Sequence, residues 1–438
     1  MSKTRIKTVT GRQVWDSRGR PTLEVEIELR YGALGRAIAP SGASTGSGEA
    51  RERRDGGARF GGLGVDCALE AITGEIAAAL KGADAADQAG IDRILIELDG
   101  TPNKERLGGN AIIATSMAAA HAAASAEKLP LWRYLEIQAG NSEPKVLPLP
   151  EIQIFGGGAH AGGRIDVQDF MVVAIGASSY GQALEWTSEI YRAAGAIMSE
   201  TGRLQGVADE GGYWPAFQRN EDGLEATMRA IEAAGLTPGQ DIGLSLDIAA
   251  SQFGRGGRYR LACDDCDMDS DELSGLLVDW IERYPIVSIE DPLAEDDPEG
   301  LSRFTWAVGK RVQVVGDDFL VTNAERIKTA AAQGICNTVL IKPNQAGTLS
   351  EASAALAAAH KTGYGTIVSA RSGETEDVTI VHLAVGWCIP QIKVGSFARS
   401  ERTAKWNEGL RIAGAMTRAG SGVTDGALPP RSGFPWRN

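Results

Sequence analysis

Six ionisable residues in the second half of the chain each end a short apolar run. Leu244-Ser245-Leu246 precedes the first of them, and Val287-Ser288-Ile289 precedes the second. In chain order the six are Asp247, Glu290, Asp317, Lys342, Arg371 and Lys393. A buried charge is costly unless it is paired or bound to a metal ion. A salt bridge at a barrel rim explains one such residue, but it explains six in succession poorly.

The order of the charges indicates a chemistry. Asp247, Glu290 and Asp317 are carboxylates on neighbouring runs, and oxygen-only clusters of this kind suit Mg²⁺. The three cations that follow suit an anionic substrate carrying a carboxylate and a phosphate. Lys342 is a candidate base, provided that neighbouring cations lower its pKa.

These residues need a scaffold that brings strand ends together. From about residue 150, short β-rich runs alternate with helical segments, which predicts a parallel sheet. The runs are 167–174, 204–208, 243–248, 286–290, 312–316, 338–342, 366–369 and 390–394, and the helices include 221–235, 272–283, 322–333 and 349–361. So many units favour a closed (β/α) barrel, although periodicity alone also allows an open sheet. In a barrel, the carboxyl ends of the strands form one mouth, where active sites are built.

The first part of the chain has a different pattern. Residues 23–29 alternate strictly between apolar residues and glutamates, which predicts a half-buried antiparallel strand. Helical periodicity follows over 67–81, and an Ala-rich helix is expected over 110–126. We therefore expect an N-terminal α+β capping domain over 1–140, a barrel over 141–419, and a Gly-, Pro- and Ser-rich, loosely ordered tail over 420–438.

Composition narrows the function classes. The chain has 438 residues, 43% of them hydrophobic, and a formal net charge of −13, which argues against nucleic acid or an anionic membrane as a partner. The polar start of the chain predicts a cytoplasmic protein. Five cysteines do not suggest a disulfide framework, and Cys263 and Cys266 are interpreted as thiols in a surface hairpin rather than half of a zinc site.

Several sequence blocks occur together in one order. They are Asp16-Ser17-Arg18-Gly19, Pro40-Ser41-Gly42-Ala43-Ser44-Thr45-Gly46, Asp209-Glu210-Gly211-Gly212, Ser288-Ile289-Glu290-Asp291-Pro292, Gly316-Asp317-Asp318, Lys342-Pro343-Asn344-Gln345 and Arg371-Ser372-Gly373-Glu374-Thr375-Glu376-Asp377. With these blocks the chain resembles enolase (phosphopyruvate hydratase) over nearly its whole length. The resemblance implies an N-terminal α+β lid on an enolase-type (β/α)8 barrel, assembled as a homodimer or a higher homo-oligomer.

The resemblance also implies a magnesium-dependent reaction on a small phospho- or phosphono-carboxylate. Asp247, Glu290 and Asp317 would bind one Mg²⁺, and Ser44 would reach a second. Lys342 would remove the proton α to the carboxylate.

Further site residues follow from the same resemblance. Glu210 would be the acid that helps to expel hydroxide, supported by the nearby Asp169. The substrate-binding set would be His160, Gln168, Arg371, Ser372 and Lys393, together with the position held by Ala370.

This sequence departs from enolases at the site itself. Enolases usually have His where Ala370 stands, Glu at Asp169, Asn at Gly156 and Asn at Arg20. Loss of the histidine removes a proton donor or hydrogen-bond partner beside the leaving hydroxyl and leaves space. Because the metal ligands and the base are retained, these changes indicate an altered substrate rather than decay.

Three hypotheses follow. The favoured one is a diverged enolase acting on a bulkier phospho- or phosphono-carboxylate, such as a carboxyphosphonoenolpyruvate synthase of phosphonate or phosphinate biosynthesis. The alternative is an ordinary enolase that converts 2-phosphoglycerate to phosphoenolpyruvate and water. The third is a non-catalytic scaffold, against which the retained Lys342, Lys393, Glu210 and metal ligands argue.

Overall fold

The N-terminal unit is built on an antiparallel sheet of three strands, β1 (Ile6–Trp15), β2 (Pro21–Leu29) and β3 (Leu34–Ile38), in that order. The computed structural model describes residues 2–43, 45–141, 146–418 and 426–436. The apolar residues of β2 are buried, and its glutamates pair with cations on the flanking strands, as Glu24 does with Arg12 and Glu28 with Lys7. The alternation predicted for residues 23–29 is confirmed.

Helices cover one face of this sheet. They are α1 (Asp66–Ala71), α2 (Ala77–Leu80), α3 (Gln88–Asp99), α4 (Gly109–Glu127) and α5 (Leu131–Gln138). The Ala-rich α4 is buried on most of its circumference and packs so closely on β3 that a Cβ at Gly35 would lie 2.1 Å from the Ala122 nitrogen. The helix predicted over 67–81 is present, but a π-helical turn at Ile72–Ile76 separates α1 from α2.

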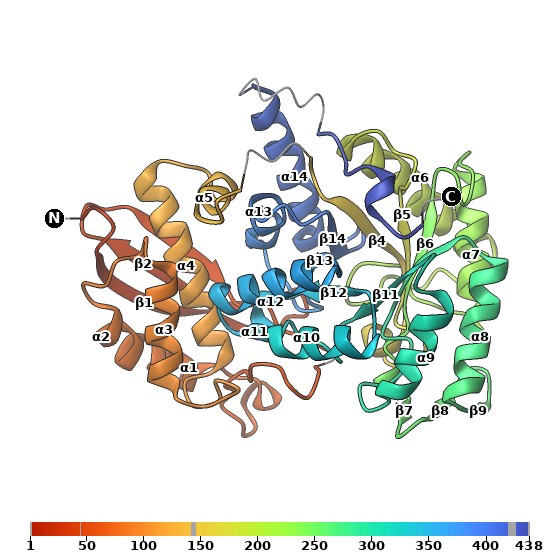
Figure 1. Cartoon of the computed structure of the whole chain (residues 1–438), viewed down its shortest axis with the longest axis horizontal. Helices are drawn as coiled ribbons and strands as arrows, with labels where there is room; N and C mark the ends of the chain where they lie inside the picture. Colours follow the sequence, from red (N-terminus) through yellow and green to blue (C-terminus); the bar gives the residue numbers. More distant parts are fainter. Residues whose placement is uncertain (1, 44, 142–145, 419–425, 437–438) are drawn as a thin grey trace.

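The second unit is a closed barrel of eight strands (Figure 1). Around the barrel they are β4 (Leu149–Gly156), β5 (Asp169–Val173), β6 (Gly243–Asp247), β10 (Ile286–Glu290), β11 (Gln313–Gly316), β12 (Thr338–Ile341), β13 (Gly365–Ser369) and β14 (Gln391–Gly395). The N-terminal unit, red to orange in Figure 1, lies beside this barrel. The closed barrel is therefore confirmed over the open sheet.

One strand runs against the others. β5 is antiparallel to both β4 and β6, whereas the remaining neighbours are parallel. The interpretation of a uniformly parallel sheet is corrected at this strand. Its reversal matters for function, because Asp169 at the start of β5 pairs with Gly156 and Asp247, the last residues of β4 and β6. Asp169 thus reaches the mouth of the barrel.

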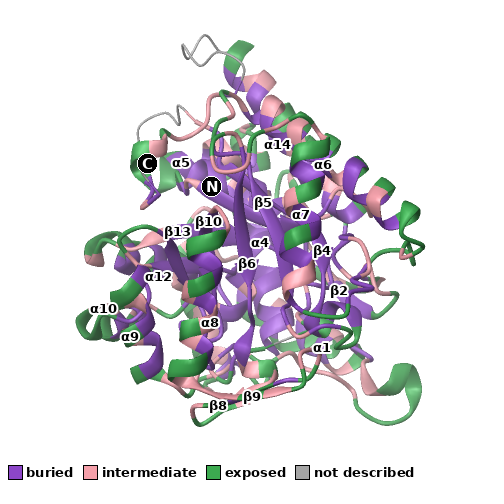
Figure 2. Ribbon diagram, turned by 90° about the vertical axis from the view of Figure 1, so that its right-hand side faces the viewer, coloured by how far each residue is buried: buried purple, intermediate pink, exposed green. Residues whose placement is uncertain are grey.

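Helices surround the barrel strands. They are α6 (Tyr180–Glu200), α7 (Glu221–Ala233), α8 (Ser270–Arg283), α9 (Pro298–Val308), α10 (Ala324–Gln333), α11 (Pro343–Ala346), α12 (Leu349–Thr362), α13 (Thr379–Gly386) and α14 (Ser400–Arg418). Figure 2 shows the strands buried and the outer faces of helices such as α8 and α10 exposed. The predicted helices 221–235, 272–283, 322–333 and 349–361 correspond to α7, α8, α10 and α12.

The sequence interpretation differs from the structure at two further places. Residues 204–208 form no strand, and only Val207 makes an isolated bridge, to Tyr213. The first barrel strand, β4, was not predicted, because it is buried along its whole length and lacks alternation. A small antiparallel sheet, β7 (Gly254–Arg255), β8 (Arg258–Leu261) and β9 (Cys266–Asp269), forms the expected surface hairpin with free thiols at Cys263 and Cys266.

The C-terminal segment is more ordered than the composition suggested. Residues 420–425 and 437–438 of the expected loose tail lie outside the described residues. In the described part, Phe434 and Trp436 stack with ring centroids 4.3 Å apart and are 4% and 5% exposed. They pack with Leu149, Val173 and Val287. The tail expectation therefore does not hold for residues 426–436, which cover one end of the barrel.

Candidate active site

The six strand-end charges meet at one mouth of the barrel. Asp247 and Glu290 are the last residues of β6 and β10, Asp317 and Lys342 directly follow β11 and β12, Arg371 follows β13 by two residues, and Lys393 lies within β14. All six are buried, and none is more than 7% exposed. Closure of the barrel brings together side chains that are far apart in sequence.

Lys393 lies between three carboxylates. Its Nζ is 2.9 Å from Asp247 Oδ2, 2.7 Å from Glu290 Oε2 and 3.5 Å from Asp169 Oδ2. Burial alone would lower the pKa of this ammonium group, but the surrounding carboxylates outweigh burial and hold it well above its usual value. Lys393 is therefore a permanent cation in this site.

Two carboxylate oxygens beside Lys393 have no partner in the part of the chain that the structure describes. They are Asp247 Oδ1 and Glu290 Oε1, both fully shielded from solvent. Burial, with the nearby Asp247, raises the pKa of Glu290 well above its ordinary value. Unpartnered buried carboxylate oxygens are costly, and a divalent cation with oxygen ligands would satisfy them. The donor set thus fits Mg²⁺.

Asp317 is in direct contact with the second lysine. Lys342 Nζ donates to Asp317 Oδ2, and Gln345 Nε2 donates to Asp317 Oδ1 over 2.9 Å. Burial raises the pKa of Asp317, but Lys342 and Arg371 outweigh it and the net pKa is low. Burial lowers the pKa of Lys342, but the Asp317 carboxylate opposes this effect, and the net shift of the pKa is upward. The lowering expected from neighbouring cations is overcome by this one contact.

The three predicted metal ligands do not form one compact group in this structure. Among the described residues, two groups of three have ligand atoms within 4.8 Å of one another: His160 with Asp169 and Glu210, and Asp291 with Asp317 and Asp318. In the second group Asp291 accepts the backbone N–H of Asp317 over 2.8 Å and that of Asp318 over 2.9 Å. Asp291 was not assigned a role from the sequence, although it directly follows Glu290. It holds the turn that carries Asp317.

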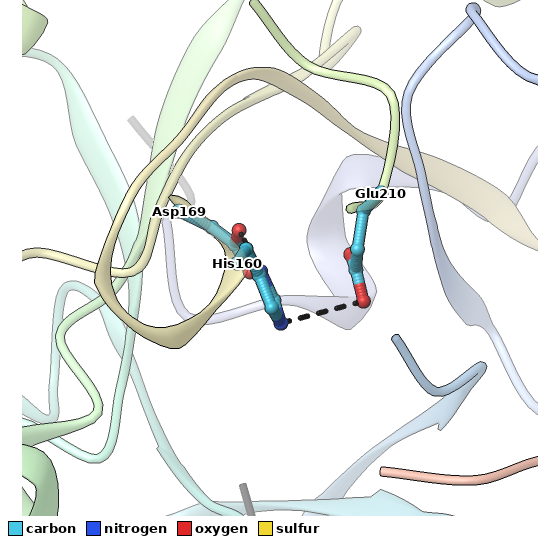
Figure 3. Close-up of side chains that lie close together, drawn as sticks. All are labelled: His160, Asp169 and Glu210. Carbon is cyan, nitrogen blue, oxygen red and sulfur yellow. Dashed lines mark hydrogen bonds and ion pairs between the residues drawn. The ribbon is translucent and has the colours of Figure 1, made fainter. Parts of the chain in front are cut away.

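The other group surrounds His160 (Figure 3). His160 Nδ1 donates to Asp169 Oδ1 over 3.0 Å, and Nε2 lies 3.7 Å from Glu210 Oε1 and 3.2 Å from Ser372 Oγ. Burial lowers the pKa of this imidazole, but Glu210 and Asp169 outweigh it and raise the net value. The His160 side chain is buried.

Gln153 of β4 is a site residue that the sequence did not single out. Its Nε2 donates to Asp169, and its Oε1 accepts the Gly212 N–H over 2.8 Å. A Cβ at Gly156 would lie 2.7 Å from Ala208 Cβ and 3.1 Å from Gln153 Nε2. A side chain at position 156 would therefore crowd the Gln153 amide. Gly156 leaves room for this amide beside Asp169, whose side chain is one methylene shorter than that of glutamate.

Gln168 lies just before β5. Its Nε2 donates to Asp247 Oδ2 over 3.0 Å, and its Oε1 accepts from Gln252 Nε2. Gln252 Oε1 in turn accepts the Ala159 N–H over 2.8 Å, which links Asp247 to the His160 loop. Gln252 was also missed, because an isolated glutamine carries no sequence signal.

The anion-binding candidates follow β13. Arg371 Nη1 lies 2.9 Å from Glu49 Oε2 of the N-terminal unit, and Ser372 Oγ accepts the Ala43 N–H over 3.1 Å. Ala370 is buried and donates its backbone N–H to the Lys393 carbonyl over 2.9 Å. Ser44, predicted to reach a second metal ion, lies outside the described residues.

Comparison with known proteins identifies the family. Residues 6–135 match the family model for the enolase N-terminal domain, and residues 144–424 match the model for the enolase C-terminal TIM barrel domain.

The chain belongs to the enolase family.

A similar protein agrees with this assignment. The chain is 49% identical over 419 residues to Enolase 1 of Desulfitobacterium hafniense (strain Y51), and the alignment covers 95% of each protein. This enolase-family chain is a carbon–oxygen lyase of the superfamily, which rules against the non-catalytic scaffold. The likeness favours the ordinary enolase over the diverged phosphonate enzyme that the sequence departures had favoured. In the described residues, no helix has the length and apolarity needed to cross a membrane.

Proposed function

We propose that this lyase removes water from 2-phosphoglycerate to form phosphoenolpyruvate, with Mg²⁺ as its cofactor. The strongest support is that three buried carboxylates and three buried cations lie together at the barrel mouth, in a chain of this family. A carbon acid next to a carboxylate is weakly acidic, so positive charge must face the oxygens where negative charge develops.

Asp247, Glu290 and Asp317 would hold one Mg²⁺, and the loop that contains Ser44 would contribute to a second site. The unpartnered Asp247 Oδ1 and Glu290 Oε1 support the first assignment. Bound Mg²⁺ supplies positive charge for the substrate carboxylate.

Separate residues of the protein transfer protons and bind the anionic groups of the substrate. Lys342 Nζ accepts the proton from the α-carbon, and Lys393 Nζ binds the substrate carboxylate. Glu210 gives its proton to the departing hydroxyl, so that the C3–O bond breaks, water leaves, and the C2–C3 double bond forms. Arg371 and Ser372 bind the phosphate. His160, held by Asp169, fixes Glu210 beside the leaving group.

A homodimer acting in the cytoplasm accords with the family resemblance. The partner molecule is a small phospho-carboxylate rather than a nucleic acid or a membrane.

A bulkier phospho- or phosphono-carboxylate is the second candidate substrate, and Ala370 is the observation that favours it. This small buried side chain stands where enolases usually carry histidine, next to Arg371 and on the same strand end. Without the imidazole, the site has one hydrogen-bond donor fewer and more room near the leaving group.

The substitution Ala370→His separates the two substrates. If the larger compound is native, histidine restores a donor near the C3 hydroxyl, and 2-phosphoglycerate dehydration rises by up to about 10²-fold. If 2-phosphoglycerate is native, the parent already turns it over efficiently and the substitution lowers the rate. The measurement is Mg²⁺-dependent formation of phosphoenolpyruvate. Ala370→Leu is the control, because it fills the space without adding a donor.

A parent and an Ala370→His variant that both lack Mg²⁺-dependent turnover and α-proton exchange would contradict the proposed function. A gain shared by Ala370→Leu would show that volume rather than proton donation is responsible. We expect Ala370→His alone to restore the activity only in part, because Asp169 and Gly156 also depart from the usual residues and their effects are not independent of position 370.

A further inference from the structure

A cavity of about 460 Å³ opens where the N-terminal unit meets the barrel mouth. It is lined by Arg20, by Leu63 and by residues 41–42, 45–47, 49–52 and 54 of the N-terminal unit, and by Asn344 and Arg371 of the barrel. Arg371 therefore belongs both to this cavity and to the catalytic mouth. The cavity therefore adjoins the position proposed for the substrate phosphate.

The cations on this wall differ in how they are neutralised. Arg371 pairs with Glu49 at 2.9 Å, and Arg51 pairs with Glu105 at 3.7 Å. Arg54 pairs with Glu52 and donates to the carbonyl oxygens of Pro21 and Leu63. Within residues 2–43, 45–141, 146–418 and 426–436, the Arg20 side chain has no ion pair or hydrogen bond. It is the cation on this wall that is free to receive a ligand.

The backbone at Arg20 is fixed in place. The Arg20 N–H donates to Asp16 Oδ1 over 2.9 Å, and the Asp16 N–H donates to the Arg20 carbonyl over 2.9 Å. Arg18 Nη2 donates to the same Asp16 carboxylate over 3.0 Å. Asp16 thus binds Arg18 and the turn, and leaves only the side chain of Arg20 to move.

The same turn is tied to the segment that follows Arg371. The Ser17 N–H donates to the Glu374 carbonyl over 2.8 Å, and Ser41 and Gly373 exchange backbone hydrogen bonds of 2.9 and 2.8 Å. The position of Arg20 relative to the proposed phosphate site is therefore set by direct backbone contacts. The Arg20 side chain extends from this fixed backbone, and an arginine guanidinium recognises carboxylate, phosphate or phosphonate oxygens through paired N–H donors.

We infer that Arg20 forms an anion-binding subsite in the cavity that Arg371 also lines, and that this subsite accepts a second phosphoryl, phosphonyl or carboxyl group of the ligand. The inference rests on the proposed function for the placement of the first phosphate at Arg371. The subsite lets this chain also bind phospho-carboxylates that carry one anionic group more than 2-phosphoglycerate does.

Equilibrium binding to the Mg²⁺-loaded, full-length protein tests the subsite without relying on turnover. The probes are 2-phosphoglycerate and 2,3-bisphosphoglycerate, which differ by one phosphate, and titration calorimetry gives both dissociation constants. Arg20→Asn is expected to weaken binding of the bisphosphate about tenfold, the usual effect of losing a charged hydrogen bond. Binding of 2-phosphoglycerate is expected to change less than about threefold. Arg20→Lys keeps the charge without the paired donors and is expected to fall between.

Arg36→Asn is the matched control, because Arg36 is an exposed arginine of the same unit that lines no part of this cavity. It removes the same charge and should leave the ratio of the two dissociation constants unchanged. Equal weakening of both ligands by Arg20→Asn, or the same ratio change in Arg36→Asn, would overturn the subsite. Absence of 2-phosphoglycerate turnover with the ratio change intact would instead overturn the proposed reaction alone.

Discussion

At the scale of single residues, Lys342 shows how a contact controls a proposed base. A base must spend part of its time uncharged, yet the pKa of Lys342 is raised because its ammonium group contacts the Asp317 carboxylate. A cation bound by Asp317 would weaken this contact and lower the pKa of Lys342. Asp317 therefore couples the proposed metal site to the proposed base.

We expect Lys342→Ala to abolish exchange of the substrate α-proton with solvent, because no amine remains to accept it. The rate of deuterium exchange at C2 of 2-phosphoglycerate, followed by NMR, should fall by at least about 10²-fold. Lys361→Ala, at an exposed lysine in the last turn of α12, should exchange at the parental rate. Parental exchange in Lys342→Ala, with substrate still bound, would assign the base to another residue.

At the scale of elements, the C-terminal segment stabilises the barrel at the end opposite the mouth. Trp436 is buried against Leu149 at the start of β4 and Val173 at the end of the reversed β5. Trp436→Ala should lower the free energy of unfolding by about 3 kcal/mol, through lost burial and the cavity left behind. Urea denaturation measures this change.

The control for that measurement is Trp306→Ala, because Trp306 on α9 is 86% exposed. Its unfolding free energy should remain within about 0.5 kcal/mol of the parent. Since Trp436 lies far from the mouth, the folded Trp436→Ala protein should keep the parental kcat. A kcat below the parental value in a fully folded Trp436→Ala protein would show that the C-terminal segment affects the active site.

At the scale of the whole molecule, a buried carboxylate joins the N-terminal unit to the barrel. Asp92 of α3 accepts from Ser116 Oγ of α4 over 2.6 Å, and from the N–H and Oγ of Ser350 of α12 over 2.9 and 2.6 Å. The joint matters for function because Glu49 of the first unit pairs with Arg371 of the second. The two units must stay together for the site to be complete.

Asp92→Ala should therefore lower the free energy of unfolding by about 3 kcal/mol, since it leaves buried donors without an acceptor. Glu189→Ala, which removes an exposed carboxylate from α6, should cost less than about 0.5 kcal/mol. Chemical denaturation of both variants supplies the comparison. Equal stabilities of the two variants would show that Asp92 does not hold the joint.

Local patterns carried much of the fold. Most barrel strands were predicted because each is an apolar run bounded by polar residues. Strand β2 was predicted because apolar residues and glutamates alternate along it. The prediction failed for 204–208, where an apolar sequence such as Leu204 and Val207 stays largely exposed. It also failed for β4, whose uniform burial resembles no amphipathic pattern. An alternating sequence pattern identifies a strand when one of its faces is buried and the other meets water. A strand that is buried on both faces has no such pattern.

The sequence by itself determined which ionisable groups end the strands and, through its motif blocks, the family. Only the tertiary structure decided how those groups pair. The reversal of β5 carries Asp169 to the mouth, and the loops bring His160 and Glu210 beside it. Whether Lys342 carries a high or a low pKa depends on its distance from Asp317. Electrostatic energies vary with separation in space and with burial, and neither can be read from separation along the chain.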